Sequence, residues 1–511
     1  MNTASWRGGL ILNIDINSVN TPFLNEAAER EPFIEETMYP FVDQYADTQV
    51  KALSFCIFCQ YSATPSKIWS DSLALYDRRM ENGVEVRYCD QYQGIYQWYR
   101  HGIDPYAVWF RRCRQRGMEA WMSIRMNDCH CPDDVACFIR SDFFYEAREK
   151  GWMIGDSYRY YRHCFDYAVP EVRKKMLDYI EEQLYRYDVD GLELDFMREP
   201  FCFDYPNCPD KIEIMNGFMG EVNKLRRQAE DFRGHGIKCI VRLPREMEQC
   251  LILGFDPETW AKEHWVDHIN VTPRWETCDN DMPIRAWKER FPETEISAGI
   301  ETLCLRNDEG PHHATADVVN GLAAAYSSQG ADAIYLFNFY LNPYRNFNMY
   351  GINMKEEKER TDTIIRRCGK GETILAAPRR HIITYQDIAP KGCVRYRPLP
   401  LPLKANEPQN ISLPIGYVPG GRAAKLILGF SEGNPEKCRI FCNGKACGEW
   451  NPCKVMALED NLDPTDAGYT RSNVKIFACN VAAESLERYQ IVLEAAEDAV
   501  LNYVEVDIRP Q

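Results

Sequence analysis

Eight apolar or alternating segments follow one another through the first two thirds of the chain, and a helical pattern comes after most of them. These segments predict strands at residues 10–17, 51–60, 119–127, 190–197, 237–243, 267–274, 294–302 and 332–340. In the best-defined helical segment, 169–187, an apolar residue recurs every four positions from Val172 to Leu184, and Pro170 suits the first turn. Strands that alternate with helices run parallel through right-handed crossovers, so eight such units predict a closed (β/α)8 TIM barrel.

The pattern changes after residue 345. A charged stretch at 351–374 predicts a helical linker, and residues 375–511 show short alternating runs separated by turn residues. Asn443-Gly444, between two apolar runs, is typical of a tight hairpin. We therefore expect a catalytic barrel over 1–350, the linker, and a C-terminal all-β sandwich over 375–511. The sandwich is expected to pack against the barrel and stabilise it, with a carbohydrate-binding module as the alternative.

Alternation with a period of two separates bulky aliphatic residues from polar ones within the predicted strands. The fourth strand shows this clearly, because Leu192, Leu194 and Phe196 alternate with Glu193 and Asp195. Polar residues gather near the carboxyl end of each strand, which is where (β/α)8 enzymes hold their sites. The predicted inward polar set is Asn13, Asp15, Asn17, Ser54, Cys56, Gln60, Ser123, Arg125, Asn127, Glu193, Asp195, Arg242, His268, Asn270, Thr272, Arg274, Ser297, Glu301, Asn338 and Tyr340.

Two carboxylates are the leading candidates for chemistry. Asp195 and Glu301 end the fourth and seventh strands, which lie on different parts of the barrel wall, so their side chains are expected to face each other across the mouth. Glycoside hydrolysis needs such a pair, because one carboxyl group protonates the leaving oxygen and the other stabilises the transition state, directly or through an activated water. Glu193, one pleat deeper, is a third candidate, which would adjust the charge environment or the orientation of Asp195. Glu246 is a reserve candidate for a catalytic acid. The alternative is that Asp195 and Glu193 only form ion pairs with Arg125, Arg198 or Arg242.

Further residues near the strand ends are candidates for substrate binding. Arginine and amide side chains bind hydroxyl or carboxylate groups, and aromatic rings stack on sugar C–H groups. The candidates are Asp15, Asn13, Arg125, Asn127, Asp128, His130, Arg198, Arg242, Asn270, Trp98, Trp275, Asn338 and Tyr340. Arg125 and Arg242 would also suit an acidic sugar, whereas an Asx-turn loop is the alternative role for Asp128 and His130.

Composition argues against several classes of protein. The net charge of −16 disfavours nucleic acid and anionic membranes as partners. No apolar run is long enough to predict a membrane-spanning helix. The start of the chain lacks the pattern of a secretion signal, and the 21 cysteines form no framework, so we expect reduced thiols and a cytoplasmic location.

Sequence motifs give no support for a metal or a cofactor. Cys56 and Cys59, in "CIFC", are expected on opposite faces of a strand, and the pair Cys129 and Cys131 in "CHC" lacks a second pair at zinc spacing. The chain also has no GxGxxG motif after its first strand, no P-loop, no HExxH and no GxSxG. We therefore expect an enzyme that works without a bound cofactor.

The segment "FDYAVPEVRKKMLDYIEEQLYRYDVDGLELDFMREP" (165–200) resembles a known group. It is similar to the (β/α)8-barrel glycoside hydrolases often described as family-10-like glycosyl hydrolase-like proteins. In them, D-x-x-x-P-E-V-R precedes Y-D-V-D-G-[hydrophobic]-x-[LF]-D, and Arg and Pro follow. The matching positions here are Asp166, Pro170, Glu171, Val172, Arg173, Tyr187 to Gly191, Asp195, Arg198 and Pro200. "SIRMNDCH" (123–130) also looks like the segment that these proteins carry after the third strand.

The resemblance implies a (β/α)8 catalytic domain, often with β-sandwich appendages, but it implies no particular substrate. Retaining barrel enzymes of the large clan A carry Asn-Glu at the end of the fourth strand, whereas this chain has Leu194-Asp195. An Asp at that place looks more like the nucleophile position of α-glycosidase barrels.

The sequence thus predicts a two-domain glycoside hydrolase that acts on an oligosaccharide or polysaccharide. One alternative is a metal-dependent barrel lyase or hydrolase, in which Asp15, His130, Asp195 and Glu301 would be the ligands. The other is a non-catalytic carbohydrate-binding protein, in which the same carboxylates only hold hydroxyl groups.

Overall fold

The fold is described from a computed structural model of the chain. It describes residues 3–16, 21–29, 32–74, 93–129, 140–155, 161–204, 207–273, 280–301, 303–306, 310–339, 354–383, 399–453 and 474–511. Among these residues, no helix has the length and apolar character needed to cross a bilayer.

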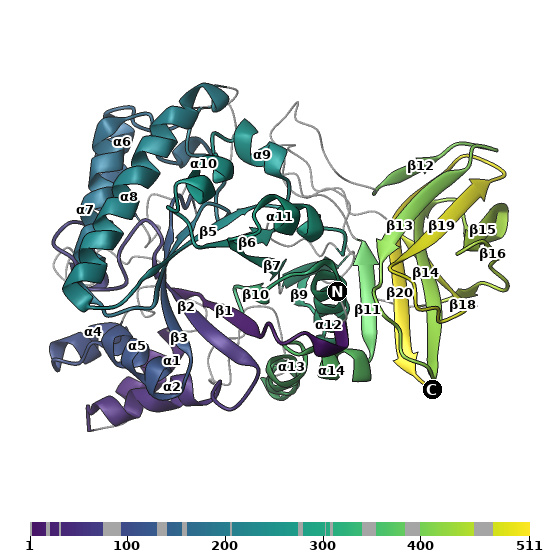
Figure 1. Cartoon of the computed structure of the whole chain (residues 1–511), viewed down its shortest axis with the longest axis horizontal. Coiled ribbons are helices and arrows are strands. Elements are labelled where there is room, and N and C mark those ends of the chain that lie inside the picture. The colour runs from purple at the N-terminus through teal and green to yellow at the C-terminus, as the bar shows by residue number, and fades with distance from the viewer. Residues whose placement is uncertain are drawn as a thin grey trace.

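Eight parallel strands close into a barrel, as the alternating pattern predicted (Figure 1). They are β1 (Leu10–Ile14), β2 (Val50–Phe58), β3 (Glu119–Arg125), β4 (Gly191–Asp195), β5 (Lys238–Pro244), β6 (His268–Thr272), β7 (Glu295–Glu301) and β10 (Ala333–Phe337). Their order around the wall is β1-β10-β7-β6-β5-β4-β3-β2, which is the TIM-barrel arrangement. A short hairpin of β8 (Leu303–Arg306) and β9 (Gly310–His313) follows β7.

Helices connect the strands around the outside of the barrel. They are α1 (Thr21–Ala28), α2 (Tyr39–Asp43), α4 (Gln93–Arg100), α5 (Pro105–Gln115), α6 (Asp142–Glu149), α7 (Pro170–Arg186), α8 (Ile212–Arg233), α9 (Met247–Ile252), α10 (Pro257–Lys262), α11 (Ile284–Arg290), α12 (Ala316–Gln329), α13 (Met354–Arg367) and α14 (Gly371–Ala376). Pro170 begins α7 as predicted, and Gly234 ends α8 in a left-handed conformation that suits glycine.

The interior of the barrel changes from apolar to polar along its axis. Leu192, Leu194 and Phe196 point to the outer helices, where the Phe196 ring lies 4.9 Å from that of Phe255. A separate apolar cluster lies inside the barrel and is formed by Ile11, Ala52, Trp121, Ile240, Ala333, Tyr335 and Phe337. Above it, towards the carboxyl ends of the strands, the inward side chains are polar. The inner apolar cluster reaches the strand ends at Phe337, which pairs with Glu301 in register, and buried polar side chains share that layer.

One face assignment was wrong. The sequence pattern placed Asn338 on the inward face of the eighth strand, together with Tyr340, which lies outside the described residues. Tyr335 and Phe337 occupy the inward face of the strand instead. The strand ends at Phe337, and Asn338 has a positive φ of 46°, so strand alternation no longer sets its direction. Asn338 still reaches the mouth of the barrel, through this left-handed turn.

The C-terminal region is a β-sandwich, as predicted. One sheet has the order β11 (Arg379–Ile383), β20 (Ala499–Pro510), β14 (Arg422–Glu432), β18 (Lys475–Val481), β17 (Asn451–Pro452), with β12 (Leu401–Leu403) also on β20. The other has the order β13 (Gln409–Pro414), β19 (Arg488–Ala495), β15 (Cys438–Cys442), β16 (Lys445–Ala446). Asn443 and Gly444 form the predicted hairpin turn between β15 and β16, both with positive φ.

The sandwich packs directly on the barrel. In its first sheet, Ile427, Ile476 and Tyr503 belong to the large hydrophobic cluster between the barrel strands and the outer helices. The opposite face of that sheet lines the sandwich core. Helix α12 lies against β11 (Figure 1). A Cβ on Gly321 would lie only 2.1 Å from the carbonyl oxygen of Arg380, so glycine permits this close approach.

Candidate active site

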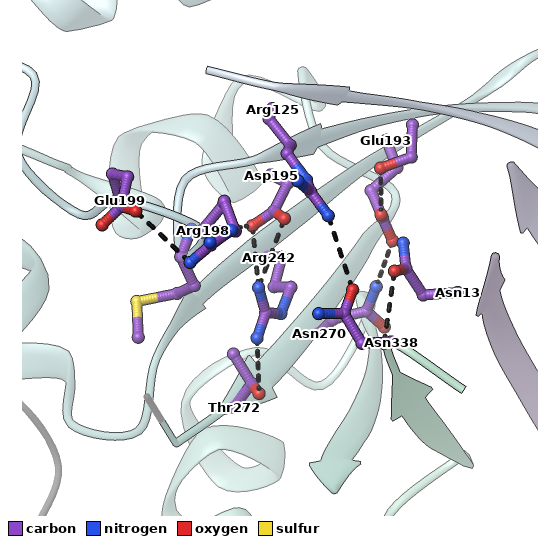
Figure 2. Close-up of polar contacts among 12 residues, drawn as sticks. Asn13, Arg125, Glu193, Asp195, Arg198, Glu199, Arg242, Asn270, Thr272 and Asn338 are labelled. Atoms are coloured by element: carbon purple, nitrogen blue, oxygen red, sulfur yellow. Dashed lines mark hydrogen bonds and ion pairs between the residues drawn. The ribbon is translucent and has the colours of Figure 1, made fainter. Parts of the chain in front are cut away.

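Asp195, at the end of β4, is a buried carboxylate with a full set of donors. Both of its oxygens accept from Nη1 of Arg242, at 3.0 and 3.2 Å, and Oδ1 also accepts the backbone N–H groups of Met197 and Arg198 at 2.8 and 2.9 Å. Arg242 in turn donates to Thr272 at 3.4 Å and lies over the ring of Phe337 (Figure 2). One guanidinium group and two backbone N–H groups therefore fix the position of the Asp195 carboxylate.

Glu193 lies two residues earlier on the same face of β4 and has a contrasting environment. Ser123 and Tyr335 donate to its Oε1 at 2.6 and 2.9 Å. Asn270 donates to Oε2 at 2.9 Å (Figure 2). Complete burial, followed by the charge of Asp195, raises the pKa of Glu193 to about 7. Two neighbouring carboxyl groups thus have different environments, and carboxyl pairs in different environments take acid and base roles in many enzymes.

A chain of alternating charges closes the side of the mouth formed by β1, β3 and the loop after β4. Arg125 donates to Asp15 and, at 2.9 Å, to Asp128, and it lies 3.4 Å from Oδ1 of Asn338. Arg198 lies 3.3 Å from Glu199 and 4.0 Å from Asp128. All of these side chains are buried. The chain of charges therefore fixes three segments that are distant in the sequence.

Glu301 ends β7, and its side chain is only 1% exposed. Strands β5 and β6 separate β4 from β7 around the wall, so Asp195 and Glu301 project into the mouth from different sides. Asn13, on β1, accepts the backbone N–H of Asn338 at 3.4 Å (Figure 2). The reserve candidate Glu246 lies beyond β5 and pairs with Arg245 at 3.1 Å.

Two candidates for substrate binding have other roles. Trp98 is 0% exposed on α4, where its Nε1 donates to the carbonyl of Leu24 and its ring meets Phe33 edge-on at 4.7 Å. The prediction of an exposed sugar platform is therefore wrong for Trp98, because its helix packs into the outer layer. Asn127 holds loop backbone instead of facing the mouth: its amide donates to the carbonyls of Phe165 and Phe201 and accepts the N–H of Phe165.

Three further candidates, His130, Trp275 and Tyr340, lie outside the described residues.

The cysteines near the mouth are buried thiols. Cys56 and Cys59 both interact with the charge of Arg125, and burial raises the pKa of Cys56 to about 12. Strand β2 is irregular after Cys56 and ends at Phe58, so the alternation that predicted opposite faces does not extend to Cys59. Among the described residues, no three His, Cys, Asp or Glu side chains are arranged to hold a metal ion.

Sequence reasoning left Glu199 and Tyr335 out of the candidate set, and it named Gln60 only as an inward polar residue. Gln60 follows β2 and is 1% exposed, yet neither amide atom has a hydrogen-bond partner in the described part of the chain. Its φ of 65° is also unusual for a residue other than glycine. A buried, unpaired amide on a strained backbone at a barrel mouth is a candidate ligand-binding group. The sequence signal was its place two residues after the strand.

No family model matches the sequence, and no curated protein matches it. Solved structures with a similar fold include a cycloisomaltooligosaccharide glucanotransferase from Paenibacillus sp., with 8% identity over 98% of this chain and 57% of that chain and a TM-score of 0.35. A GH138 enzyme targeting pectin rhamnogalacturonan II has 10% identity over 70% of this chain and 38% of that chain, with a TM-score of 0.39. The α-L-fucosidase isoenzyme 1 from Paenibacillus thiaminolyticus has 13% identity over 96% of this chain and 97% of that chain, with a TM-score of 0.37. Because all three TM-scores are below 0.5, these proteins do not indicate a reaction for this chain.

Proposed function

We propose that the protein is a glycoside hydrolase that cleaves a glycosidic bond at the carboxyl-terminal mouth of the barrel. The observation that carries this proposal is the pair of carboxyl groups on β4, Asp195 and Glu193, which one strand holds in opposite electrostatic environments. Such a pair, with a further carboxyl group across the mouth, matches the needs of glycosidic cleavage.

In this proposal, Asp195 stabilises the positive charge that develops on the sugar ring, as nucleophile or through a water. Glu301 approaches from β7 and protonates the leaving oxygen. Glu193 lies beneath Asp195 and tunes it, because its protonation decides whether a second negative charge lies two residues away. Asp15, Arg125, Arg198 and Asn338 would position the substrate or the loops around it.

The ion pairs favour this proposal over a metal-dependent reaction. The metal-dependent alternative names four ligands, and two of them already form ion pairs. Asp15 pairs with Arg125, and Asp195 pairs with Arg242. A guanidinium group beside each carboxylate neutralises the charge that would attract a cation.

The test is hydrolysis of a broad glycan panel, including uronate- and sulfate-bearing polymers, by the wild-type protein and by Asp195→Asn and Glu301→Gln. Loss of a positioned acid or base lowers turnover by about 10²–10⁴-fold, and we expect each variant to lose at least 10²-fold while its thermal unfolding stays cooperative. Asp178→Asn is the matched control, since Asp178 lies on the outside of α7 and its one ion pair within the described ranges is with Lys174. Full activity in Asp195→Asn would remove the proposal, and binding without hydrolysis across the panel would favour a non-catalytic sugar-binding protein.

A further inference from the structure

A second group of buried polar residues lies where the sandwich meets the barrel. It consists of Arg379 and His381 on β11, and Asn280 in the segment before α11. The backbone N–H of Asn280 donates to the carbonyl of Ile382 at 3.0 Å, so the barrel segment runs along the free edge of β11. The group therefore lies at a junction between the two parts of the fold.

Strand register places the two basic side chains between the sandwich sheets. Arg379 pairs with Ile508 and His381 with Val506 across the β11–β20 ladder. Ile508 and Val506 belong to the sandwich core, and directly paired residues share a face. Arg379 and His381 thus point into the sandwich and away from the barrel.

Arg379 is 1% exposed, and neither Nη1 nor Nη2 has a hydrogen-bond partner among the described residues. Burial, followed by the charge of Arg422, lowers the pKa of Arg379 to about 10, so the group is still a cation at neutral pH. A buried charge without a counter-charge is strongly unfavourable, and native proteins normally pair it. Arg379 therefore lacks a negatively charged hydrogen-bond acceptor among the described residues.

His381 lies beside Arg379 and is also buried. Nδ2 of Asn280 donates to the carbonyl of Pro414, which fixes the orientation of the amide. The same Nδ2 lies 3.4 Å from Nδ1 of His381, and the ring also has a hydrogen bond with the backbone of Pro414. Burial, followed by the charge of Arg379, lowers the pKa of His381 well below its usual value, so the ring is neutral and carries one proton. Nε2 of the ring has no partner within the described chain either.

We propose that Arg379 and His381 form an internal binding site for a small inorganic anion at the junction of sandwich and barrel. The anion would accept from Nη1 and Nη2 of Arg379, and from Nε2 of His381 in the tautomer that carries the ring proton there, and it would supply the negative charge that Arg379 lacks. A halide meets these needs, and so does a small oxyanion such as hydrogen phosphate, whose own proton would also satisfy the unpaired Oδ1 of Asn280. This site is independent of glycan hydrolysis.

The experiment is thermal unfolding of the full chain at constant ionic strength, with sodium gluconate replaced stepwise by chloride or by phosphate. A ligand that binds only the folded state raises the Tm in a saturable way. We expect a rise of about 2 °C for the wild-type protein in at least one of the two series, and a flat response for Arg379→Met. Arg439→Met is the matched control, because Arg439 is an exposed arginine of the same sandwich, and it should respond as the wild type does.

A bromide-soaked crystal gives an independent readout, with an anomalous peak expected beside Arg379. Wild-type protein whose Tm does not respond to either anion would overturn the proposal, as would an equal response in Arg379→Met. If Arg379→Met is more stable than the wild type in every buffer, the arginine is buried without any counter-ion and no site exists.

Discussion

The raised pKa of Glu193 makes stability depend on pH in a way that one substitution isolates. In the unfolded chain this carboxyl group titrates near 4.5, whereas in the folded protein its pKa is about 7. The folded state therefore binds more protons than the unfolded state between these values, and the free energy of unfolding falls as pH rises through that window. At 1.36 kcal/mol per pKa unit, the full effect is about 3 kcal/mol.

Glu193→Gln removes the titration while it preserves the shape of the side chain. Its Oε1 can still accept from Ser123 and Tyr335. Nε2 of the new glutamine would face Nδ2 of Asn270, which is also a donor. Oδ1 of Asn270 has no partner among the described residues, so a flip of the Asn270 amide turns this oxygen to accept from the glutamine. We expect the variant to fold.

The assay is urea denaturation of the wild-type protein and of Glu193→Gln at several pH values from 5 to 8. The difference in unfolding free energy, wild type minus variant, should fall by about 2.5 kcal/mol over this range, because the groups that both proteins share cancel. Glu213→Gln, on the exposed side of α8, is the control and should show no such trend. A difference that stays constant within about 0.5 kcal/mol would refute the reasoning, since it would mean that Glu193 is already ionised at pH 5 or still neutral at pH 8.

Two further substitutions test the environment of the mouth. Arg242→Met leaves Asp195 buried without its ion-pair partner. We expect a loss of about 3–5 kcal/mol in unfolding free energy, measured by urea denaturation at pH 7. An unchanged midpoint would show that the two backbone N–H groups are enough to stabilise the buried carboxylate. Gln60→Gly relieves a positive φ and removes a buried unpaired amide, so it should raise the unfolding free energy by about 1 kcal/mol while it weakens the apparent affinity (KM) for any glycan that the wild type cleaves. Destabilisation by Gln60→Gly would instead show that the amide has a structural role.

Much of the fold followed from local patterns. All eight barrel strands, the helix that begins at Pro170 and the turn at Asn443-Gly444 are where periodicity and turn chemistry placed them. The direction of Glu193 and Asp195 towards the interior could also be predicted, because strand alternation depends only on neighbouring residues. The pattern failed where strands ended, as at Asn338 and Cys59.

Contacts between distant segments needed the closed barrel. The sequence named three arginines as possible partners for the acids, and only the register of β4 beside β5 pairs Asp195 with Arg242. Arg125 reaches Asp15, 110 positions away, because β2 alone separates β3 from β1 in the wall. Trp98 looked like a sugar platform because composition cannot show which face of a short helix is covered.

The sequence by itself determined that two acids on one strand point into a barrel. The tertiary structure decided that one of them, Asp195, pairs with Arg242, and that burial raises the pKa of the other, Glu193, to about 7. The physical reason is that a strand fixes direction locally, whereas burial and charge come from residues that meet only when the barrel closes.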